Sequence, residues 1–239
     1  MLTWHELECG AYEADLSIWK ELANKERRLT GAGPVLDVGA GSGRVALHLA
    51  RGGHPVVAID REPALLSALA EAGTGLPVET VCADARSFEL SSHEHPLCLM
   101  PMQTIQLLDG RDDRLEFMRR AHAHLRDGGL LAVAIVTEVD TYDCRRGDHG
   151  PTPEVGRRGG VRYMSHALRI ARENGAIVIE RERTMSPGEL EIDVVRLAEL
   201  SPSLLHEEGR EAGFVAEQTV EIAETFEHAG SQVVMLRRA

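Results

Sequence analysis

Three glycines and a carboxylate stand where they could hold a nucleoside. Gly39, Gly41 and Gly43 alternate with small residues directly after an apolar run at residues 34–38. Because glycine has no Cβ, such a turn lets the backbone pass close to a ligand. Asp60 ends the next apolar run, and a carboxylate at that position can accept both hydroxyl protons of a ribose. These residues predict a nucleoside-binding turn between a strand and a helix.

The spacing of the glycines distinguishes two kinds of nucleotide site. A dinucleotide fingerprint reads G-x-G-x-x-G and binds a pyrophosphate at the N-terminus of the following helix. In this chain the last position of that pattern is Arg44, and the third glycine comes one residue earlier. We therefore keep a nicotinamide-dependent oxidoreductase only as the least favoured alternative.

Two further strand ends carry residues suited to a nucleoside. Asp84 follows an apolar run at residues 78–82, where its carboxylate could accept the amino protons of an adenine. The run at residues 97–100 ends in Met100 and Pro101, which are apolar enough to line the base. Each carboxylate alone is equally typical of a turn or a helix cap. Their order at successive strand ends favours one shared site.

Alternating apolar runs and helical segments must bring these strand ends together. We expect strands at residues 34–38, 55–59, 78–82, 97–100 and 130–136, and helices at residues 64–71 and 115–125. This alternation predicts a doubly wound α/β fold, in which ligands bind at the carboxyl ends of parallel strands. Helical spacing at residues 11–29 predicts a flanking lid. The chain should close with a capped helix at residues 201–212 and strands near residues 214–222 and 231–236.

The segment between residues 162 and 200 predicts a three-stranded antiparallel meander. Asn174-Gly175 is a strong hairpin signal, and a second turn is expected at residues 186–188. Closing both turns gives a register in which apolar residues face apolar ones and opposite charges meet. The expected partners are Arg169 with Glu180, Ile170 with Ile179, Ala171 with Val178, Arg181 with Asp193, Arg183 with Glu191 and Ile179 with Val195.

One face of that meander should have an apolar end and a polar end, and we place His166 at the polar end. The apolar end would cover the core or a dimer partner. Residues 140–160 are rich in Gly, Pro, Arg and Asp, so we expect a mobile loop over the site there.

Charge and composition limit the class of protein. The chain of 239 residues has 26 Lys and Arg against 38 Asp and Glu, a net charge of −12, which disfavours a nucleic-acid partner. We find no apolar stretch long enough to cross a membrane and no basic leader segment, and expect a cytoplasmic protein. The four cysteines are scattered without metal-ligand spacing, so we expect buried thiols and no metal site.

The ordered motifs resemble those of the class I S-adenosylmethionine-dependent methyltransferases. Residues 34–49 look like motif I, 56–60 like motif II, 81–85 like motif III and 97–108 like motif IV. The turn at residues 125–130 is similar to the family's L-x-P-G-G turn, with Asp127 in place of the proline. The first half resembles the bacterial small-molecule group, including the aminosugar and glycine N-methyltransferase types, whereas the meander matches its substrate-covering sheet more weakly.

The resemblance implies a Rossmann-like, mostly parallel seven-stranded sheet with an antiparallel C-terminal strand. It divides a single domain, 1–239, into a helical lid (1–30), a cofactor-binding half (31–139), a substrate-covering loop and meander (140–200) and a closing helix with strands (201–239). S-adenosylmethionine is the implied cofactor. The residues implied to bind it are Tyr12, Trp19, Asp37, Gly39, Ala40, Gly41, Gly43, Asp60, Arg61, Asp84, Ala85, Met100 and Pro101. Asp37 would hold the ammonium of the methionine part, and Tyr12 and Trp19 would close over that end.

The implied reaction is an in-line displacement of a methyl group onto an N or O atom of a small molecule, in specialised or xenobiotic metabolism. The protein must orient the acceptor, and a base is optional for an amine. We take Tyr12, His149 and His166 as catalytic candidates. The alternatives are a protein methyltransferase and a protein of this fold that uses S-adenosylmethionine for non-methylating chemistry such as cyclisation. A homodimer through the meander is a further expectation.

Overall fold

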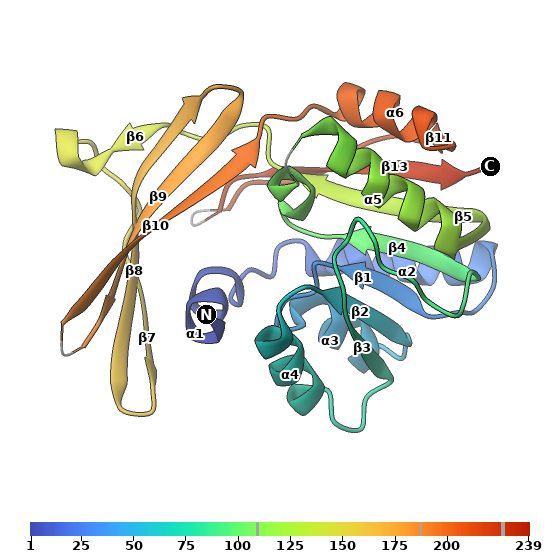
Figure 1. Ribbon diagram of the computed structural model, residues 1–239, viewed down its shortest axis with the longest axis horizontal. Coiled ribbons are helices and arrows are strands. Elements are labelled where there is room, and N and C mark those ends of the chain that lie inside the picture. The colour runs from blue at the N-terminus through green and yellow to red at the C-terminus, as the bar shows by residue number, and fades with distance from the viewer. Residues whose placement is uncertain (109, 187, 226–227) are drawn as a thin grey trace.

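The protein consists of a large sheet covered by helices and a smaller antiparallel sheet beside it (Figure 1). The computed structural model describes residues 1–108, 110–186, 188–225 and 228–239. The helices are α1 (Leu2–Cys9), α2 (Leu16–Leu29), α3 (Arg44–Arg51), α4 (Pro63–Ala72), α5 (Arg111–His124) and α6 (Pro202–Glu211), with 3-10 turns η1 (Thr104–Leu107) and η2 (Cys144–Arg146).

The large sheet has the order expected of a doubly wound fold. Its continuous path contains β11 (Phe214–Ala216), β13 (Ser231–Arg238), β5 (Leu125–Ile135), β4 (His95–Met100), β1 (Val35–Val38), β2 (Val56–Asp60) and β3 (Val78–Cys82). The strands from β5 to β3 are parallel, and β13 is antiparallel to β5. A short strand, β12 (Val220–Ile222), also pairs with β13. The predicted fold class is confirmed in this sheet.

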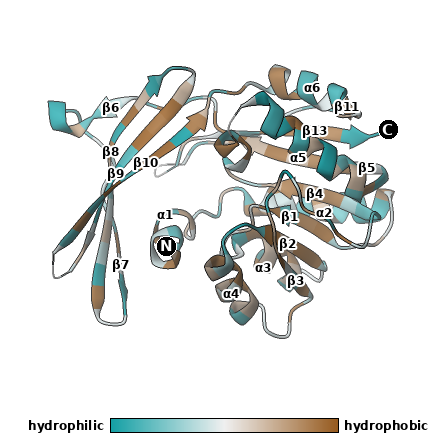
Figure 2. Ribbon diagram, in the orientation of Figure 1, coloured by the Kyte–Doolittle hydropathy of each residue, from teal (hydrophilic) through white to brown (hydrophobic). Residues whose placement is uncertain are grey.

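Burial explains why these segments are strands. Every residue of β1 and β4 is buried, as expected for parallel strands covered on both faces. Helices α2, α3 and α4 contribute to the core on one face, and α5 and α6 to the core on the other. Figure 2 shows the resulting concentration of hydrophobic residues in the central strands. The carboxyl ends of β1, β2, β3 and β4 consequently lie along one edge.

The smaller sheet confirms the predicted hairpin register. It contains β10 (Glu189–Ala198), β9 (Ala176–Met185), β8 (Val161–Glu173) and β6 (Tyr142–Asp143) in that order, and β7 (Glu154–Arg158) also pairs with β8. All six predicted partnerships are present. Asn174 and Gly175 have φ of 52° and 73°, the left-handed pair that such a hairpin turn requires. At the second turn, residue 187 lies outside the described residues.

Two sequence-based expectations about this part of the chain were wrong. The predicted three-stranded meander is present as β8, β9 and β10, but residues 140–160, expected to be a loop, add β6 and β7 to the sheet within the described ranges. The register of β8 shifts between Ala167 and Arg169, so Leu168 is an extra residue in a bulge that reverses the alternation of faces. His166 therefore lies on the opposite face from Arg181 and Arg183, not beside them. Its direct partner is Glu182.

Smaller differences concern element ends. The predicted helix at residues 115–125 begins at Arg111 and ends at His124, and Leu125 already belongs to β5. The lid contains α1 in addition to the predicted helix, which begins only at Leu16. The closing helix is capped as expected, since the hydroxyl of Ser201 accepts the N–H of Leu204 at 3.2 Å.

Candidate active site

The glycine-rich turn lies at the carboxyl end of β1, and all three glycines have left-handed backbone angles. Their φ values are 76° for Gly39, 57° for Gly41 and 95° for Gly43. A Cβ on Gly39 would overlap Thr104, and one on Gly43 would overlap Leu69. These two glycines are therefore needed for internal packing. A Cβ on Gly41 would instead overlap the imidazole of His5 from α1. Gly41 is therefore on the side of the turn that faces away from the core, which we call the open side although α1 covers it.

Asp60 fastens this turn to the end of β2. Its Oδ2 accepts the backbone N–H of Gly41 at 2.8 Å, and its Oδ1 accepts that of Glu62 at 2.9 Å. Each carboxylate oxygen can accept a second hydrogen bond. The backbone N–H groups of Gly39 and Ala40 donate to the carbonyl of Ile59 at 2.8 and 3.1 Å. Hence the turn offers a carboxylate and a close backbone approach, and the N–H groups of Gly39, Ala40 and Gly41 are already used within the protein.

Asp37 is a buried carboxyl directly before the turn. It is 1% exposed, and neither of its carboxyl oxygens has a hydrogen-bond partner within the part of the chain that the structure describes. Burial raises its pKa to about 7, although the nearby charge of Arg44 and the N–H of Ala46 oppose the rise. The N–H of Ala46 lies near this carboxyl without completing a hydrogen bond. A buried acceptor left in this state is costly, and an ammonium group would supply a donor.

Asp84 is already bound by its own loop. Arg86 donates to Oδ1 through Nε at 2.8 Å and to Oδ2 through Nη2 at 2.7 Å, and its backbone N–H also reaches Oδ1 at 2.8 Å. The same guanidinium reaches Asp113 at 2.8 Å. The side-chain hydrogen bonds from Arg86 lower the pKa of Asp84 to about 2. Asp84 can accept a hydrogen bond from an adenine amino group only while it also keeps these bonds to Arg86.

The remaining predicted contacts of the base differ in exposure. Met100 and Pro101 are buried at the end of β4, and Ala85 packs partly buried against the same core cluster. Arg61 is exposed and lies 3.7 Å from the carboxylate of Glu62. The structure thus brings the apolar residues and Asp60 to the same edge of the sheet, while Arg61 points into solvent.

A buried network joins the lid to the turn. Arg44, the first residue of α3, donates to the two carboxylate oxygens of Asp15 at 2.5 and 2.7 Å and to the carbonyl of Tyr12 at 2.8 Å. The indole Nε1 of Trp19 donates to Asp15 at 2.8 Å. Trp19 is 0% exposed and belongs to the core, so the expectation that it closes over the cofactor was wrong. The helix period alone does not tell a core aromatic residue from a lid residue.

Tyr12 remains near the turn but is largely enclosed. Its ring lies 4.9 Å from that of His228 and 5.1 Å from the guanidinium carbon of Arg44, and 7% of the residue is exposed. Burial, followed by the charge of Asp15, raises the pKa of its phenol. Tyr12 therefore stays protonated at neutral pH and is suited to donate a hydrogen bond rather than to remove a proton.

The two histidine candidates lie away from the turn. His149 is exposed and follows Asp148, whose carboxylate accepts the N–H of Asp143 at 2.8 Å. This places it next to β6, at the outer end of the smaller sheet (Figure 1). His166 lies on the face of the smaller sheet opposite Arg181 and Arg183. We call this the outer face, because the other, inner face contacts α1 through Arg183. The structure does not bring either of them together with Gly41 and Asp60.

Helix α1 supplies site residues that the sequence did not reveal. His5 lies over Gly41, and its Nδ1 is 3.4 Å from the hydroxyl of Ser42. Burial lowers its pKa, although the charge of Asp60 opposes this. Glu8 binds Arg183 of β9 at 2.7 and 2.8 Å and accepts the hydroxyl of Ser165 at 2.7 Å. No periodicity or motif marks these contacts, because they depend on how a short helix docks.

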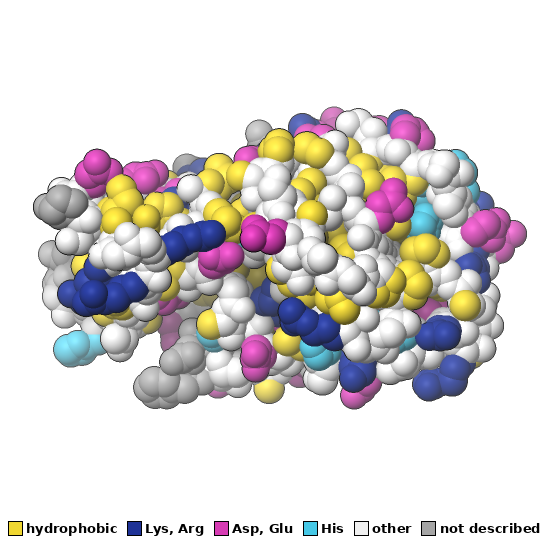
Figure 3. Space-filling model, turned by 90° about the horizontal axis from the view of Figure 1, so that it is seen from below, with side chains coloured by type: hydrophobic (Ala, Val, Ile, Leu, Met, Phe, Trp, Pro, Cys, Tyr) yellow, Lys and Arg dark blue, Asp and Glu magenta, His cyan; other side chains and the backbone are white. Residues whose placement is uncertain are grey.

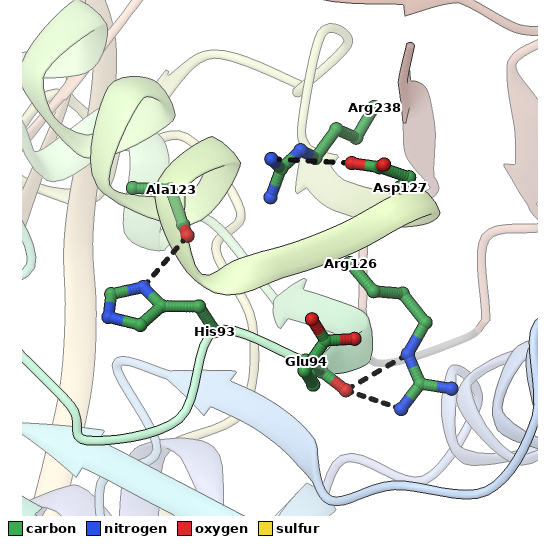
Figure 4. A pocket seen from close by; sticks show the side chains of 6 residues that line it. All are labelled: His93, Glu94, Ala123, Arg126, Asp127 and Arg238. Carbon is green, nitrogen blue, oxygen red and sulfur yellow. Dashed lines mark hydrogen bonds and ion pairs between the residues drawn. The ribbon is translucent and has the colours of Figure 1, made fainter.

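A cavity of about 310 Å³ lies at the other end of the sheet, where β4 and β5 begin. Figure 4 shows Arg126 and Arg238 among the residues that line it. Arg126 donates to the carbonyls of Thr30, Ala32 and Glu94, so it fastens loops together. This cavity is remote from the carboxyl edge and is not part of the site. No cluster that could hold a metal ion occurs among the described residues.

Comparison with known proteins gives a family for part of the chain. Residues 35–129, which contain the turn, Asp60 and Asp84, match the model of the methyltransferase domain family. The chain thus contains a methyltransferase domain on a doubly wound fold. A search of curated proteins by sequence gives no match. No helix within the described ranges is both long and apolar enough to span a membrane.

Solved structures resemble this chain over all or nearly all of its length. An amino pentose methyltransferase of calicheamicin biosynthesis from Micromonospora echinaspora is 18% identical, with a TM-score of 0.73 and coverage of 100% of this chain and 97% of that one. A sugar N-methyltransferase from Streptoalloteichus is 19% identical, with a TM-score of 0.75 and coverage of 100% and 92%. A methyltransferase from Clostridium acetobutylicum is 12% identical, with a TM-score of 0.71 and coverage of 99% and 96%. At these identities the likeness establishes the fold.

Proposed function

We propose that this methyltransferase transfers a methyl group from S-adenosylmethionine to a nitrogen or oxygen atom of a small molecule, with an amine as the preferred acceptor. The observation that carries the proposal is the joint placement of Gly41, Asp60 and the unpartnered Asp37 at one edge of the sheet. Such a site suits a ligand that has both a ribose and an ammonium group. When bound, the cofactor supplies a methyl group activated by a sulfonium.

Each of these residues has a definite task toward that cofactor. Asp60 accepts the ribose hydroxyl protons with the lone pairs that the turn leaves free. Asp37 accepts a proton of the ammonium group, directly or through water. Gly41 allows close approach of the backbone. Ala85, Met100 and Pro101 form an apolar border for the adenine, and Asp84 reaches its amino group beside Arg86.

The acceptor enters between the turn and the inner face of the smaller sheet. A neutral amine needs no base before transfer, which agrees with the positions of His149 and His166 outside this region. The protein then contributes orientation and exclusion of water. Tyr12 donates a hydrogen bond near the reacting atoms. Two of the similar structures are an amino pentose methyltransferase and a sugar N-methyltransferase, which supports an amine-bearing small molecule and a place in specialised metabolism.

A nucleic-acid acceptor is disfavoured by charge. The net charge is −12, and on the face drawn in Figure 3 the Lys and Arg side chains are interspersed with Asp and Glu. A phosphate backbone would meet a repulsive average field. A protein acceptor and non-methylating use of the cofactor are alternative outcomes of the test below.

The test is mass spectrometry of a reaction with S-adenosylmethionine and a panel of amino sugars, each paired with its hydroxyl analogue. We expect S-adenosylhomocysteine to accumulate together with an N-methylated amino sugar. The Asp60→Asn variant, compared at the same protein concentration, controls for adventitious activity. Cofactor consumption without any methylated product would contradict methyl transfer, and methylation of added protein alone would contradict a small acceptor.

A further inference from the structure

Helix α1 occupies the open side of the glycine-rich turn. The His5 imidazole fills the space that a Cβ on Gly41 would need, and its Nδ1 lies 3.4 Å from the hydroxyl of Ser42. The backbone of Gly41 is the part of the turn that a nucleoside must approach closely. A ligand of Asp60 and an imidazole at this position therefore compete for the same space.

Polar contacts, together with the aromatic contacts of Trp4 to Tyr163 and Arg183, hold α1 in this position. The helix has eight residues, none of them buried, and Met1 provides no side-chain cap. Helices this short are marginal in isolation, because the cost of nucleation is recovered over few hydrogen bonds. Figure 1 shows α1 between the smaller sheet and α4, connected to α2 by a short segment. The helix can therefore leave without breaking a hydrophobic core.

The strongest of these contacts is at Glu8. Arg183 binds its carboxylate with two nitrogens, at 2.7 and 2.8 Å, and Ser165 donates to it at 2.7 Å. The Glu8 and Arg183 side chains are only 9% and 15% exposed. Asp193 of the neighbouring strand also holds Arg183 at 2.9 Å, so the receiving side belongs to the rigid sheet. By contrast, Glu6 pairs with Arg158 at the surface.

We propose that α1 is an intramolecular plug of the cofactor site, in which His5 covers Gly41 and the pairing of Glu8 with Arg183 and Ser165 latches the helix shut. Cofactor binding displaces α1, so the measured affinity is the intrinsic affinity reduced by the fraction of molecules that are open. The inference rests on the proposed function, since it assigns the covered site to S-adenosylmethionine and its product.

The first test is calorimetric titration of the full-length protein and its variants with S-adenosylhomocysteine. Because Glu8→Gln removes the charge of the latch, we expect about threefold to tenfold tighter binding. Glu6→Gln makes the same change on the same helix at an exposed pair, and we expect less than about a twofold effect. If Glu8→Gln bound S-adenosylhomocysteine as tightly as the wild type or more weakly, the proposal that α1 is a plug would be overturned. Failure of every variant to bind would overturn the proposed function as well.

The second test follows the helix itself. The chain has two tryptophans; Trp19 is fully buried, whereas Trp4 is on α1, 5.2 Å from the ring of Tyr163. Acrylamide quenching of tryptophan fluorescence therefore reports mainly on α1. We expect S-adenosylhomocysteine to increase quenching in the wild type and to change it little in Trp4→Phe. Unchanged quenching of the wild type at saturating ligand would contradict displacement of the helix.

Discussion

Arg44 binds both carboxylate oxygens of Asp15, at 2.5 and 2.7 Å, and thereby joins the lid to the first residue after the glycine-rich turn. The Asp15 side chain is 1% exposed and that of Arg44 is 11% exposed. At the position where a dinucleotide fingerprint requires glycine, this chain has an arginine that fixes the segment before α2 to the glycine-rich turn.

Breaking this pair should be costly. In Asp15→Asn the Arg44 charge stays buried without its partner, and we expect the free energy of unfolding to fall by about 3 kcal/mol or more, measured by urea denaturation. Glu211→Gln is the matched control, because Glu211 pairs with Arg111 at the surface with both side chains about half exposed, and it should lose about 1 kcal/mol or less. Similar losses in both variants would refute the assignment of a buried, stabilising network.

The two predicted carboxylates at the strand ends should differ in their effect on cofactor affinity. Asp60→Asn removes the charged acceptor of the ribose hydroxyls, so we expect binding of S-adenosylhomocysteine to weaken about tenfold to a hundredfold. Asp84→Asn should weaken it about threefold or less, because Arg86 already occupies that carboxylate. Calorimetry of both variants checks the ranking. The reverse order would show that Asp84, not Asp60, is the main polar anchor.

Asp37 should make stability depend on pH in a definite direction. Burial raises its folded pKa to about 7 from an unfolded value of 3.8. The folded state therefore binds the proton more strongly, and its stability falls as pH rises from about 4 through 7. The difference in free energy of unfolding between Asp37→Asn and the wild type should therefore grow by a few kcal/mol in favour of the variant over this pH range. Above about pH 8 that difference should stay constant. Denaturation curves at pH 5 and pH 8 measure the difference. A pH-independent difference would contradict the raised pKa.

The same carboxyl should release a proton when the cofactor product binds. At pH 6 Asp37 is mostly protonated, and an ammonium group beside it favours the charged form. Calorimetry in two buffers of different ionisation enthalpy should show release of about one proton at pH 6, declining toward zero above about pH 8. Asp37→Asn should show no such release. Equal proton release by the two proteins would place the ammonium elsewhere.

Local patterns predicted the fold and the edge of the sheet at which the candidate cofactor residues lie. Parallel strands collect their carboxyl ends at one edge, so the positions of Gly41 and Asp60 followed from chain order alone. The register of the hairpin at Asn174 also followed, because turn type and charge pairing agree there. Local patterns did not predict those features of the structure that depend on packing between residues far apart in the chain.

The exceptions illustrate that limit. The bulge at Leu168 adds one residue without any glycine or proline to mark it, and it moves His166 to the other face. Residues 140–160 have a loop-like composition, yet part of the segment gains strand structure by pairing with β8. His5 carries no recognisable motif. Its place over Gly41 depends on the docking of α1 against a sheet far along the chain.

The central claim is that the glycine-rich turn, Asp37 and Asp60 form a site for S-adenosylmethionine. Calorimetric titration of the full-length protein with S-adenosylhomocysteine tests it most directly. We expect one ligand per chain, an affinity tighter than about 1 mM and marked weakening by Asp60→Asn. Absence of binding at millimolar ligand to the wild type and to Glu8→Gln, in which the plug is unlatched, would contradict the account.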